Sequence, residues 1–402
     1  MKYIPAILPL PLEGTFTYSV PQDLEDIIKV GMRVVVPCGQ KKTYTALCVE
    51  VTDKKPNIGV KNIKCIYSVL DDMPMLLPQQ LKLWQWMADY YMCTLGDIYK
   101  AALPAGLKAE DGYRPKTETY VGLTEKFHDE MALNIALDMV SRYEKQQKAL
   151  AGYLELSHWA EISGTAIPDD IKEITQTELC NVTHCTTPTV KSLVKRGILE
   201  IYQKEVGRLN TDGEFTPQNA KLLNEAQQEA YNQVLMQFMK KNVVLLHGVT
   251  SSGKTEIYIH LILKALQDHK QVLFLLPEIA LTVQIMERLQ RVFGSRLGIY
   301  HSKYSDAERV EIWKKQVSAC PYDIIIGARS AALLPFKNLG LVIIDEEHET
   351  SYKQQDPAPR YHARSAAIML ASMYGAKTLL GSATPCMETY TNAKNGKFGY
   401  VR

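Results

Sequence analysis

The chain has 402 residues, of which 46% are hydrophobic and 22% are charged, and its formal net charge is +2. These values are typical of a globular protein with two or three domains of about 150 residues each. Because the charge is nearly balanced, a uniformly basic nucleic-acid-binding chain is excluded, and any nucleic-acid site has to be found in local motifs. The sequence has no apolar run that approaches the roughly 20 residues needed for a membrane-spanning helix.

The N-terminus and the cysteines indicate a cytoplasmic protein. Pro5, Pro9 and Pro11 interrupt the first residues, and there is no small-residue cleavage site, so this segment does not resemble a signal peptide. The eight cysteines are scattered and form no C-x-x-C pair. We therefore expect reduced thiols and no structural metal centre within this chain.

Residues 1–110 are predicted to form a first, β-rich domain. Short β-branched runs bounded by proline and glycine turns predict strands at 3–8, 33–36, 44–51 and 62–66, followed by a helix over 78–93. From these patterns alone the block is a small structural sheet or barrel capped by a helix.

Residues 111–207 are predicted to form a second, mostly helical domain. The helix Thr187–Arg196, the glycine at 197 and a following strand are typical of a winged helix. The helix is only moderately basic, with Lys191, Lys195 and Arg196. A winged helix that serves as a spacer or as a protein contact is therefore as good an interpretation as one that binds DNA. Residues 205–216 are predicted to form a linker.

Residues 208–402 alternate between strands and helices. Apolar strands are predicted at 243–246, 272–276, 297–300, 323–326, 341–344 and 378–381. Continuous Val, Ile and Leu runs separated by helices are typical of a parallel sheet covered on both faces. The whole chain is thus predicted to be a multidomain α/β protein.

A phosphate-binding loop follows the strand at 243–246. Residues 248–255 fit the pattern G-x-x-x-x-G-K-[ST] between a strand and a helix, which is the context that such a loop requires. The predicted ATP-binding residues are Gly248, Thr250, Ser251, Ser252, Gly253, Lys254 and Thr255. Lys254 is expected at the β- and γ-phosphates and the Thr255 hydroxyl at Mg²⁺. The alternative is a glycine turn before an ordinary helix.

Polar residues follow the other strands at the same edge of the predicted sheet. In open α/β sheets ligands bind beyond the carboxyl ends of the strands. Asp345, after the strand at 341–344, is expected to contact Mg²⁺ through water, and Glu346 is the candidate base that orients the attacking water. The alternative for this acidic run is a solvated helix start.

Several motifs carry a family resemblance. Gly248–Thr255, Asp345-Glu346-Glu347-His348 and Gly381-Ser382-Ala383-Thr384-Pro385 resemble motifs I, II and III of superfamily 2 DEAD/DEAH-type helicases. The finer matches at 275–282, 326–331, 351–355 and 360–364 are similar to the PriA-type primosomal replication-restart helicases. The resemblance implies a RecA-like lobe with Lys254, Asp345, Glu346 and His348 in the catalytic set and Gln227 at the adenine.

The N-terminal block resembles that family's domain for the 3′ end of a nascent DNA strand. The matching segments are 11–18, 31–37 and 86–91. The resemblance implies a terminal-nucleotide pocket of Phe16, Thr17, Gly39 and Lys64. Thr17 departs from the acidic residue that is common in the family.

The segment from Ser351 to Arg364 resembles the family's aromatic-rich loop, which couples DNA to hydrolysis. The implied DNA-binding or coupling residues are Arg329, Tyr352, Lys353, Arg360, Tyr361, His362, Arg364, Ser382 and Thr384. Aromatic rings interleaved with cations can stack bases and hold phosphates. The alternative is an exposed loop with incidental aromatic residues.

The family implies an ATP- and Mg²⁺-dependent 3′→5′ DNA helicase in the bacterial cytoplasm that restarts replication at stalled forks. Its implied partners are branched DNA with a nascent 3′ end, single-stranded-DNA-binding protein and primosome proteins, and a monomer is expected. The second ATPase lobe, with its arginine finger, and the family's zinc-binding cysteines do not occur before Arg402. We therefore expect a fragment that hydrolyses ATP weakly. The competing hypothesis is a fork-binding scaffold in which nucleotide is only a switch. A small-molecule NTPase or kinase is disfavoured because it leaves the loop Tyr352–Arg364 and both N-terminal domains without a role.

Overall fold

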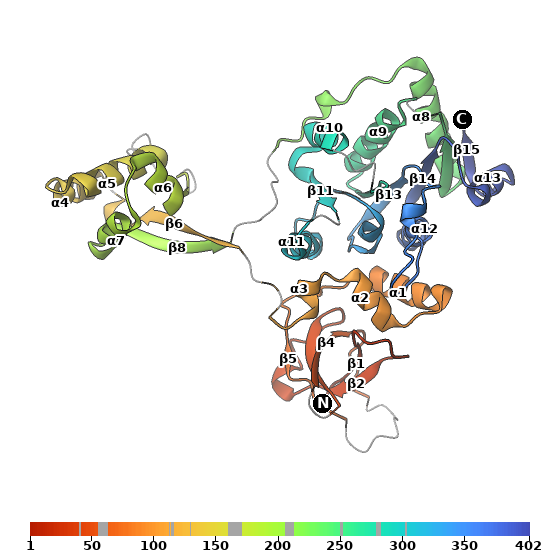
Figure 1. The fold of residues 1–402 in the computed structure, drawn as a ribbon, viewed down its shortest axis with the longest axis horizontal. Helices are drawn as coiled ribbons and strands as arrows, with labels where there is room; N and C mark the ends of the chain where they lie inside the picture. Colours follow the sequence, from red (N-terminus) through yellow and green to blue (C-terminus); the bar gives the residue numbers. More distant parts are fainter. Residues whose placement is uncertain are drawn as a thin grey trace. The chain divides into compact units, whose positions relative to one another are not determined.

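The computed structural model describes residues 1–39, 42–54, 63–111, 113, 116–128, 130–159, 171–205, 213–249, 252–278, 283–301 and 304–402. The chain divides into two compact units (Figure 1): Met1–Arg114 together with Leu209–Arg402, and Pro115–Arg208. The second unit is thus inserted into the sequence of the first. None of the helices in the described ranges has the length and apolar character needed to cross a membrane.

An antiparallel sheet begins the first unit. Its strands are β1 (Tyr3–Ile7), β2 (Phe16–Ser19), β3 (Arg33–Cys38), β4 (Lys42–Cys48) and β5 (Ser68–Val69), in the order β2-β1-β4-β3-β5. Alternate residues such as Ile4, Val34 and Ala46 fill one buried face. The predicted strand at 62–66 is wrong within the described residues: Cys65 makes an isolated bridge to Ser19, and the paired strand is β5. A short 3-10 turn, η1 (Gln22–Leu24), lies between β2 and β3.

Three helices follow this sheet: α1 (Pro78–Tyr91), α2 (Leu95–Ala102) and α3 (Ala105–Lys108). The helix predicted over 78–93 ends at Tyr91 because Met92 adopts a left-handed conformation with φ 48°. Thr94 then starts α2: its hydroxyl accepts a hydrogen bond from the Asp97 amide, and the Asp97 carboxylate accepts one from the Thr94 amide. Such a reciprocal cap satisfies two helix N-terminal donors at once.

The parallel sheet of the first unit confirms the predicted α/β fold. Its strands are β9 (Val243–His247), β10 (Gln271–Leu275), β11 (Leu297–Tyr300), β12 (Ile324–Gly327), β13 (Leu339–Ile344), β14 (Lys377–Ser382) and β15 (Gly399–Val401). Their order is β11-β12-β10-β13-β14-β9-β15, and every neighbouring pair is parallel. The first six lie within two residues of their predicted positions, whereas β15 was not predicted.

Helices cover both faces of this sheet, as the alternation of side chains requires. The helices are α8 (Glu225–Lys240), α9 (Lys254–Gln267), α10 (Val283–Phe293), α11 (Asp306–Val317), α12 (Ala363–Tyr374) and α13 (Met387–Lys394), with short turns η5 (Pro217–Asn219), η6 (Gly294–Arg296), η7 (Arg329–Leu333) and η8 (Thr350–Tyr352). Val244, Phe274 and Ile343 pack with α8, α9 and α10. Leu245 and Val342 point to the other face, among residues of α11 and α12.

The helices α1–α3 share that second hydrophobic core with the parallel sheet. Trp84 of α1 and Trp313 of α11 are both fully buried in it. The Gln80 side-chain amide donates to the Leu333 carbonyl at 2.9 Å, and Trp313 Nε1 donates to the Met75 carbonyl at 2.8 Å. The N-terminal sheet and the parallel sheet are therefore parts of one packed body rather than two loosely tethered pieces.

The second unit combines a small antiparallel sheet with helices. It contains β6 (Thr117–Leu123), η2 (Glu125–Phe127), α4 (Glu130–Val140), α5 (Glu144–Leu156), β7 (Ile174–Thr175), α6 (Gln176–Thr183), α7 (Thr187–Lys195) and β8 (Leu199–Glu205). The sheet order is β7-β6-β8. The helix predicted over 187–196 corresponds to α7, and Gly197 with φ 71° allows the turn into β8. The pairing of β6 with β8 was not predicted. The linker predicted over 205–216 lies largely outside the described residues.

Candidate ATP site and DNA-coupling loop

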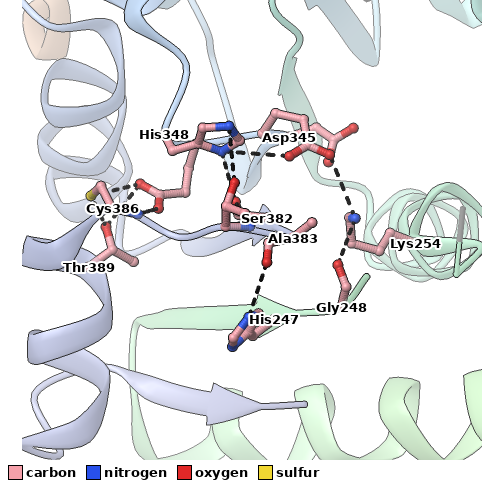
Figure 2. A network of polar contacts seen from close by, with 12 residues as sticks. His247, Gly248, Lys254, Asp345, His348, Ser382, Ala383, Cys386 and Thr389 are labelled. Atoms are coloured by element: carbon pink, nitrogen blue, oxygen red, sulfur yellow. Dashed lines mark hydrogen bonds and ion pairs between the residues drawn. The ribbon is translucent and has the colours of Figure 1, made fainter. Parts of the chain in front are cut away.

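The predicted catalytic residues Lys254, Asp345, Glu346 and His348 lie at the carboxyl edge of the parallel sheet. Since β9, β10, β12, β13 and β14 run in the same direction, the loops that follow them leave from one edge. The Gly248 amide donates to the Ser382 carbonyl at 3.1 Å, which ties the phosphate loop after β9 to the end of β14. Figure 2 shows how residues from the segments at the ends of β9, β13 and β14 lie close together.

The phosphate loop turns directly into α9. Gly253 is the N-cap of this helix with φ 82°, a left-handed conformation that glycine adopts without strain. Lys254 is the first helical residue; its side chain is only 8% exposed, and Nζ donates to the Gly248 carbonyl at 3.0 Å. Ser252 is exposed and Thr255 half-buried. The predicted ATP-binding residues Thr250 and Ser251 lie outside the described residues.

Gln227 contacts this loop from the start of α8. Its side chain forms a reciprocal cap with Asn224, and its Nε2 lies 3.4 Å from the Ser252 carbonyl. A Cβ at position 253 would overlap the end of the flexible Gln227 side chain, so it is the φ of 82° rather than this contact that favours glycine here. The structure thus brings Gln227 to the loop, while its role at an adenine stays a prediction.

Asp345 and Glu346 leave the end of β13 beside Lys254. Tyr258 of α9 donates to Asp345 Oδ1 at 2.8 Å, and Glu346 Oε1 lies 3.6 Å from Lys254 Nζ. Burial raises the pKa of Asp345 above its usual value, and the neighbouring Glu346 charge adds to this, while the Tyr258 hydroxyl and Lys254 oppose it. Glu346 itself has φ 42°, a conformation that is uncommon for a residue with a Cβ.

His348 joins this acidic segment to the end of β14. Its Nδ1 lies 2.9 Å from Ser382 Oγ and its Nε2 lies 3.3 Å from Thr384 Oγ1. The Thr384 amide donates to Ser382 Oγ at 3.0 Å. These contacts join the second and third motifs predicted from the sequence (Figure 2). On the other side, His247 contacts the Ala383 carbonyl at 3.2 Å and the Tyr400 hydroxyl at 3.0 Å.

Glu347 was not predicted as a site residue, yet it is the most enclosed of the acidic run. Its side chain is fully buried and accepts hydrogen bonds from the Cys386 amide at 2.8 Å and the Thr389 hydroxyl at 3.0 Å. It also forms an ion pair with Arg364 of α12. Nothing in the spacing of the sequence indicates this pair, because it depends on α12 lying beside the end of β14.

The aromatic-rich loop differs from its predicted form. Tyr352 and Tyr361 are buried, at 0% and 1% exposure, so the expectation that these rings stack bases does not fit their placement. The Tyr352 hydroxyl donates to the Asp345 carbonyl at 2.7 Å and the Tyr361 hydroxyl to the Arg329 carbonyl at 3.3 Å. Both rings hold the loop against the parallel sheet because their apolar bodies gain more from the core than from water.

The cations of the loop are placed in different ways. Arg360 is exposed and pairs with Asp356 at 2.8 Å. Arg329 donates to the Lys353 carbonyl at 3.0 Å, and Arg364 is engaged by Glu347. Arg360 is therefore the most exposed of these cations, and Arg364 is held by Glu347, while the contact of either residue with DNA stays a prediction.

His362 and Lys353 close the base of the loop against α1. These two residues form a β-bridge, the His362 amide donates to the Tyr91 hydroxyl at 3.1 Å, and Lys353 Nζ lies 5.5 Å from the centre of the Tyr91 ring. Burial and the nearby Arg364 and Lys353 charges lower the pKa of His362 to about 4. His362 is therefore neutral near pH 7 and lacks the charge to hold a phosphate.

The predicted 3′-end residues lie at one corner of the N-terminal sheet. Lys64 Nζ donates to the Gly39 carbonyl, and the Lys64 carbonyl accepts from the Ser19 amide at 2.9 Å. Phe16 and Thr17 are half-buried on the same strand as Ser19. Gly39 has φ 66° and open space around its Cβ position. The structure brings Lys64 to Gly39 and to the end of β2, while the contact of all four residues with a terminal nucleotide stays a prediction.

Three family models match the chain in succession. Residues 6–104 match a 3′ DNA-binding domain, residues 118–206 match the winged helix domain of PriA helicase from Bacteroidota, and residues 224–393 match the DEAD/DEAH box helicase family.

Curated relatives extend this similarity over the whole chain. Replication restart protein PriA of Bacillus subtilis is 33% identical over 434 residues, covering 96% of this chain and 53% of the relative. The protein of the same name from Haemophilus influenzae is 33% identical over 408 residues, covering 100% and 52%. The chain thus spans about half the length of these relatives. Among solved structures, the DUF1998 helicase MrfA covers 52% of this chain and 31% of its own with 21% identity and a TM-score of 0.32, an overlap too low to carry an argument.

Proposed function

This chain belongs to the family of replication restart protein PriA, and from that premise we propose that it supplies the DNA-recognition part and the first ATP-binding lobe of an ATP-dependent 3′→5′ DNA helicase. The proposed task is to recognise stalled or branched replication forks and to restart replication by primosome assembly. The observation that carries this proposal is the meeting of Lys254, Glu346 and His348 at one sheet edge, in the same packed body as the N-terminal sheet.

The residues at the sheet edge fit a nucleotide with Mg²⁺, which DEAD/DEAH-type helicases use in general. The Thr255 hydroxyl and the Asp345 carboxylate are hard oxygen ligands of the kind that Mg²⁺ prefers. Gly381 supports this fit: a Cβ at that position would overlap the Tyr258 hydroxyl and lie 3.2 Å from Asp345 Oδ1, so the glycine keeps room for the carboxylate. When bound, the ion neutralises phosphate charge.

The chain's own residues then have distinct proposed roles. Lys254, at the N-terminus of α9, is proposed to hold the phosphates together with the loop amides. Glu346 is proposed to position and deprotonate the attacking water, and its distance of 3.6 Å from Lys254 supports this role. His348, Ser382 and Thr384 link this site to the end of β14, and Gln227 is proposed to read the adenine.

For DNA, we propose that Phe16, Thr17, Gly39 and Lys64 contact the 3′-terminal nucleotide of the nascent strand. The match of residues 6–104 to a 3′ DNA-binding domain supports this role. Arg360, Lys353 and Arg329 are proposed to hold the DNA backbone. The same proposal includes the domain limits 1–110, 111–207 and 208–402. It also includes a monomeric state in the bacterial cytoplasm, with primosome proteins and single-stranded-DNA-binding protein as partners.

Fork recognition is tested by binding at fixed salt, because phosphate contacts make every affinity salt-dependent. Forks with and without a 3′ end at the branch are titrated against the chain, the variant Lys64→Ala and the control Lys54→Ala, which changes an exposed lysine of the same domain outside the predicted pocket. We expect tighter binding of the fork with the 3′ end, a preference lost in Lys64→Ala and kept in the control. Equal binding of both forks by the wild-type chain would refute the 3′-end role.

The motor role is tested with Lys254→Ala against Lys264→Ala, an exposed lysine on the same helix. Loss of a charge-assisted phosphate contact is expected to weaken binding of an ATP analogue by at least about tenfold. In a form of the protein that carries a second ATPase lobe, DNA-stimulated hydrolysis is expected to disappear in Lys254→Ala alone. Hydrolysis that is undiminished by this substitution would refute the helicase assignment.

A further inference from the structure

We propose that Glu347 is a positioning residue that couples DNA on the loop of residues 353–362 to nucleotide at the phosphate loop. This inference rests on the proposed function, because it needs both ligands to bind. It concerns a carboxylate that is fully buried.

The loop of residues 353–362 is held together internally. The Gln354 amide donates to the Tyr361 carbonyl at 2.9 Å, and the buried Gln354 side chain donates to the carbonyls of Pro357 and Pro359, each at 2.9 Å. Lys353 and His362 pair at its base. Because its ends are joined, a ligand that displaces the exposed tip displaces the whole loop.

The loop passes directly into α12. His362 is the N-cap of this helix, and Arg364 is its second residue. The Arg364 guanidinium contacts the Glu347 carboxylate, the Glu347 carbonyl at 3.3 Å and Cys386 Sγ at 2.7 Å. A displacement of the loop therefore reaches Glu347 through a single side chain.

Glu347 is tied on its other side to the nucleotide residues. It follows Glu346, whose carboxylate faces Lys254. The Glu347 amide donates to the Gly381 carbonyl at 3.1 Å, and position 381 adjoins the Tyr258–Asp345 pair. The Glu347 carboxylate also accepts from the Cys386 amide, which follows the segment Ser382–Thr384. Motifs two and three are thus both fixed to the residue that Arg364 holds.

A buried ion pair suits this task because its members cannot separate independently. Once Arg364 leaves, Glu347 is a buried charge without its counterion, which is strongly unfavourable. The segment around Glu347 therefore has to follow Arg364 when the loop moves. The result is a coupling between two ligands, which linkage makes reciprocal.

The experiment measures the affinity of a fluorescent Mg²⁺–ATP analogue with and without a saturating deoxythymidine oligonucleotide. Glu347→Gln removes the charge and keeps the shape. Because a single change leaves Arg364 unpaired, the double variant Glu347→Gln with Arg364→Met removes both charges together. The matched control, Arg296→Met with Asp323→Asn, removes a 2.6 Å ion pair before β11 and β12, at the opposite edge of the sheet.

In the wild-type chain we expect DNA to strengthen analogue binding by roughly 5- to 150-fold, the usual range of allosteric coupling. In the folded Glu347 variants that ratio is expected to fall to about 1, while the affinities for each ligand alone change less than about threefold. The control pair is expected to keep the ratio.

A wild-type ratio near 1, or folded variants that keep the wild-type ratio, would overturn this inference and leave the proposed function standing. A loss of both separate affinities with an unchanged ratio would reduce Glu347 to a structural role. A wild-type chain that binds neither ligand would refute the proposed function itself.

Discussion

Lys254 Nζ lies 3.6 Å from Glu346 Oε1, so the cation of the phosphate loop and the carboxylate after β13 face each other across the ends of two strands. The sheet order separates these strands by β14. The ends of β9 and β13 therefore lie close enough for side chains that follow them to meet. Lys254, which is expected to hold the phosphates, is thus beside Glu346, which is expected to activate water.

The backbone at Glu346 should carry measurable strain. Glu346 has φ 42°, and this backbone conformation costs a residue with a Cβ about 1 kcal/mol or more. Glycine avoids that cost, but it loses more conformational entropy on folding, which offsets part of the gain. We expect Glu346→Gly to unfold in urea with a free energy about 0.5 kcal/mol higher than Glu346→Gln, since both variants lose the charge that attracts Lys254. In a form of the protein that carries a second ATPase lobe, both should lose hydrolysis by about 10²- to 10⁴-fold. A glycine variant less stable than the glutamine variant would contradict the strain.

Asp345→Asn should stabilise the fold at neutral pH. Burial first, and the Glu346 charge next, raise the pKa of Asp345 above its ordinary 3.8 in the folded chain. A raised folded pKa means that this group contributes most stability below pH 3.8 and loses it as the pH rises through the folded value. Urea unfolding at several pH values should show that the free energy of unfolding of the variant increases relative to that of the wild type as the pH rises. In a separate titration, the variant should bind the Mg²⁺–ATP analogue more weakly than the wild type. Parallel pH profiles would exclude the raised pKa.

His362→Gln should remove part of the acid sensitivity of the fold. Burial, and then the charges of Arg364 and Lys353, lower the His362 pKa from 6.5 to about 4. A depressed folded pKa gives stability that is fully present above pH 6.5 and is lost as the pH falls toward 4. An NMR titration of the His362 ring is the direct measurement. A midpoint near 6.5 would show that the ring is solvated rather than enclosed.

Gln80→Met should loosen the shared core between α1 and the parallel sheet. Gln80 is fully buried and donates to the Leu333 carbonyl, so methionine leaves that carbonyl unpaired at a cost of about 1–3 kcal/mol. Gln85→Met, at an exposed position of the same helix, is expected to stay within about 0.5 kcal/mol of the wild type. Equal effects of the two substitutions on urea unfolding would contradict a rigid contact at Gln80.

The strands of the parallel sheet could be predicted because their signal is local. Continuous apolar runs such as Leu341–Ile344 leave few alternatives to a buried strand, and the polar residues behind them mark the carboxyl edge. The strand β15 was missed because three residues of mixed character, Gly399–Val401, carry no such pattern. Its pairing with β9 is decided by tertiary contacts.

The placement of side chains in the loop from Ser351 to Arg364 could not be predicted, because it depends on segments far away in the sequence. The residue types of the loop show which chemistry is available, but not which side chains face water. Tyr352 and Tyr361 are drawn into the core by the neighbouring helix and sheet, and Arg364 is taken up by a carboxylate. Burial is set by the packing of distant segments, which the order of residue types in one loop does not contain.

The insertion of residues 115–208 into the first unit has a consequence for biosynthesis. A ribosome makes α1, with Trp84 and Met87, well before it makes α11 and α12, on which these side chains pack. Domains generally fold as units in the order of synthesis. The inserted unit can therefore complete its own core while the apolar side of α1 still waits for its partner. Until α12 emerges, the apolar side of α1 is a surface to which a chaperone can bind.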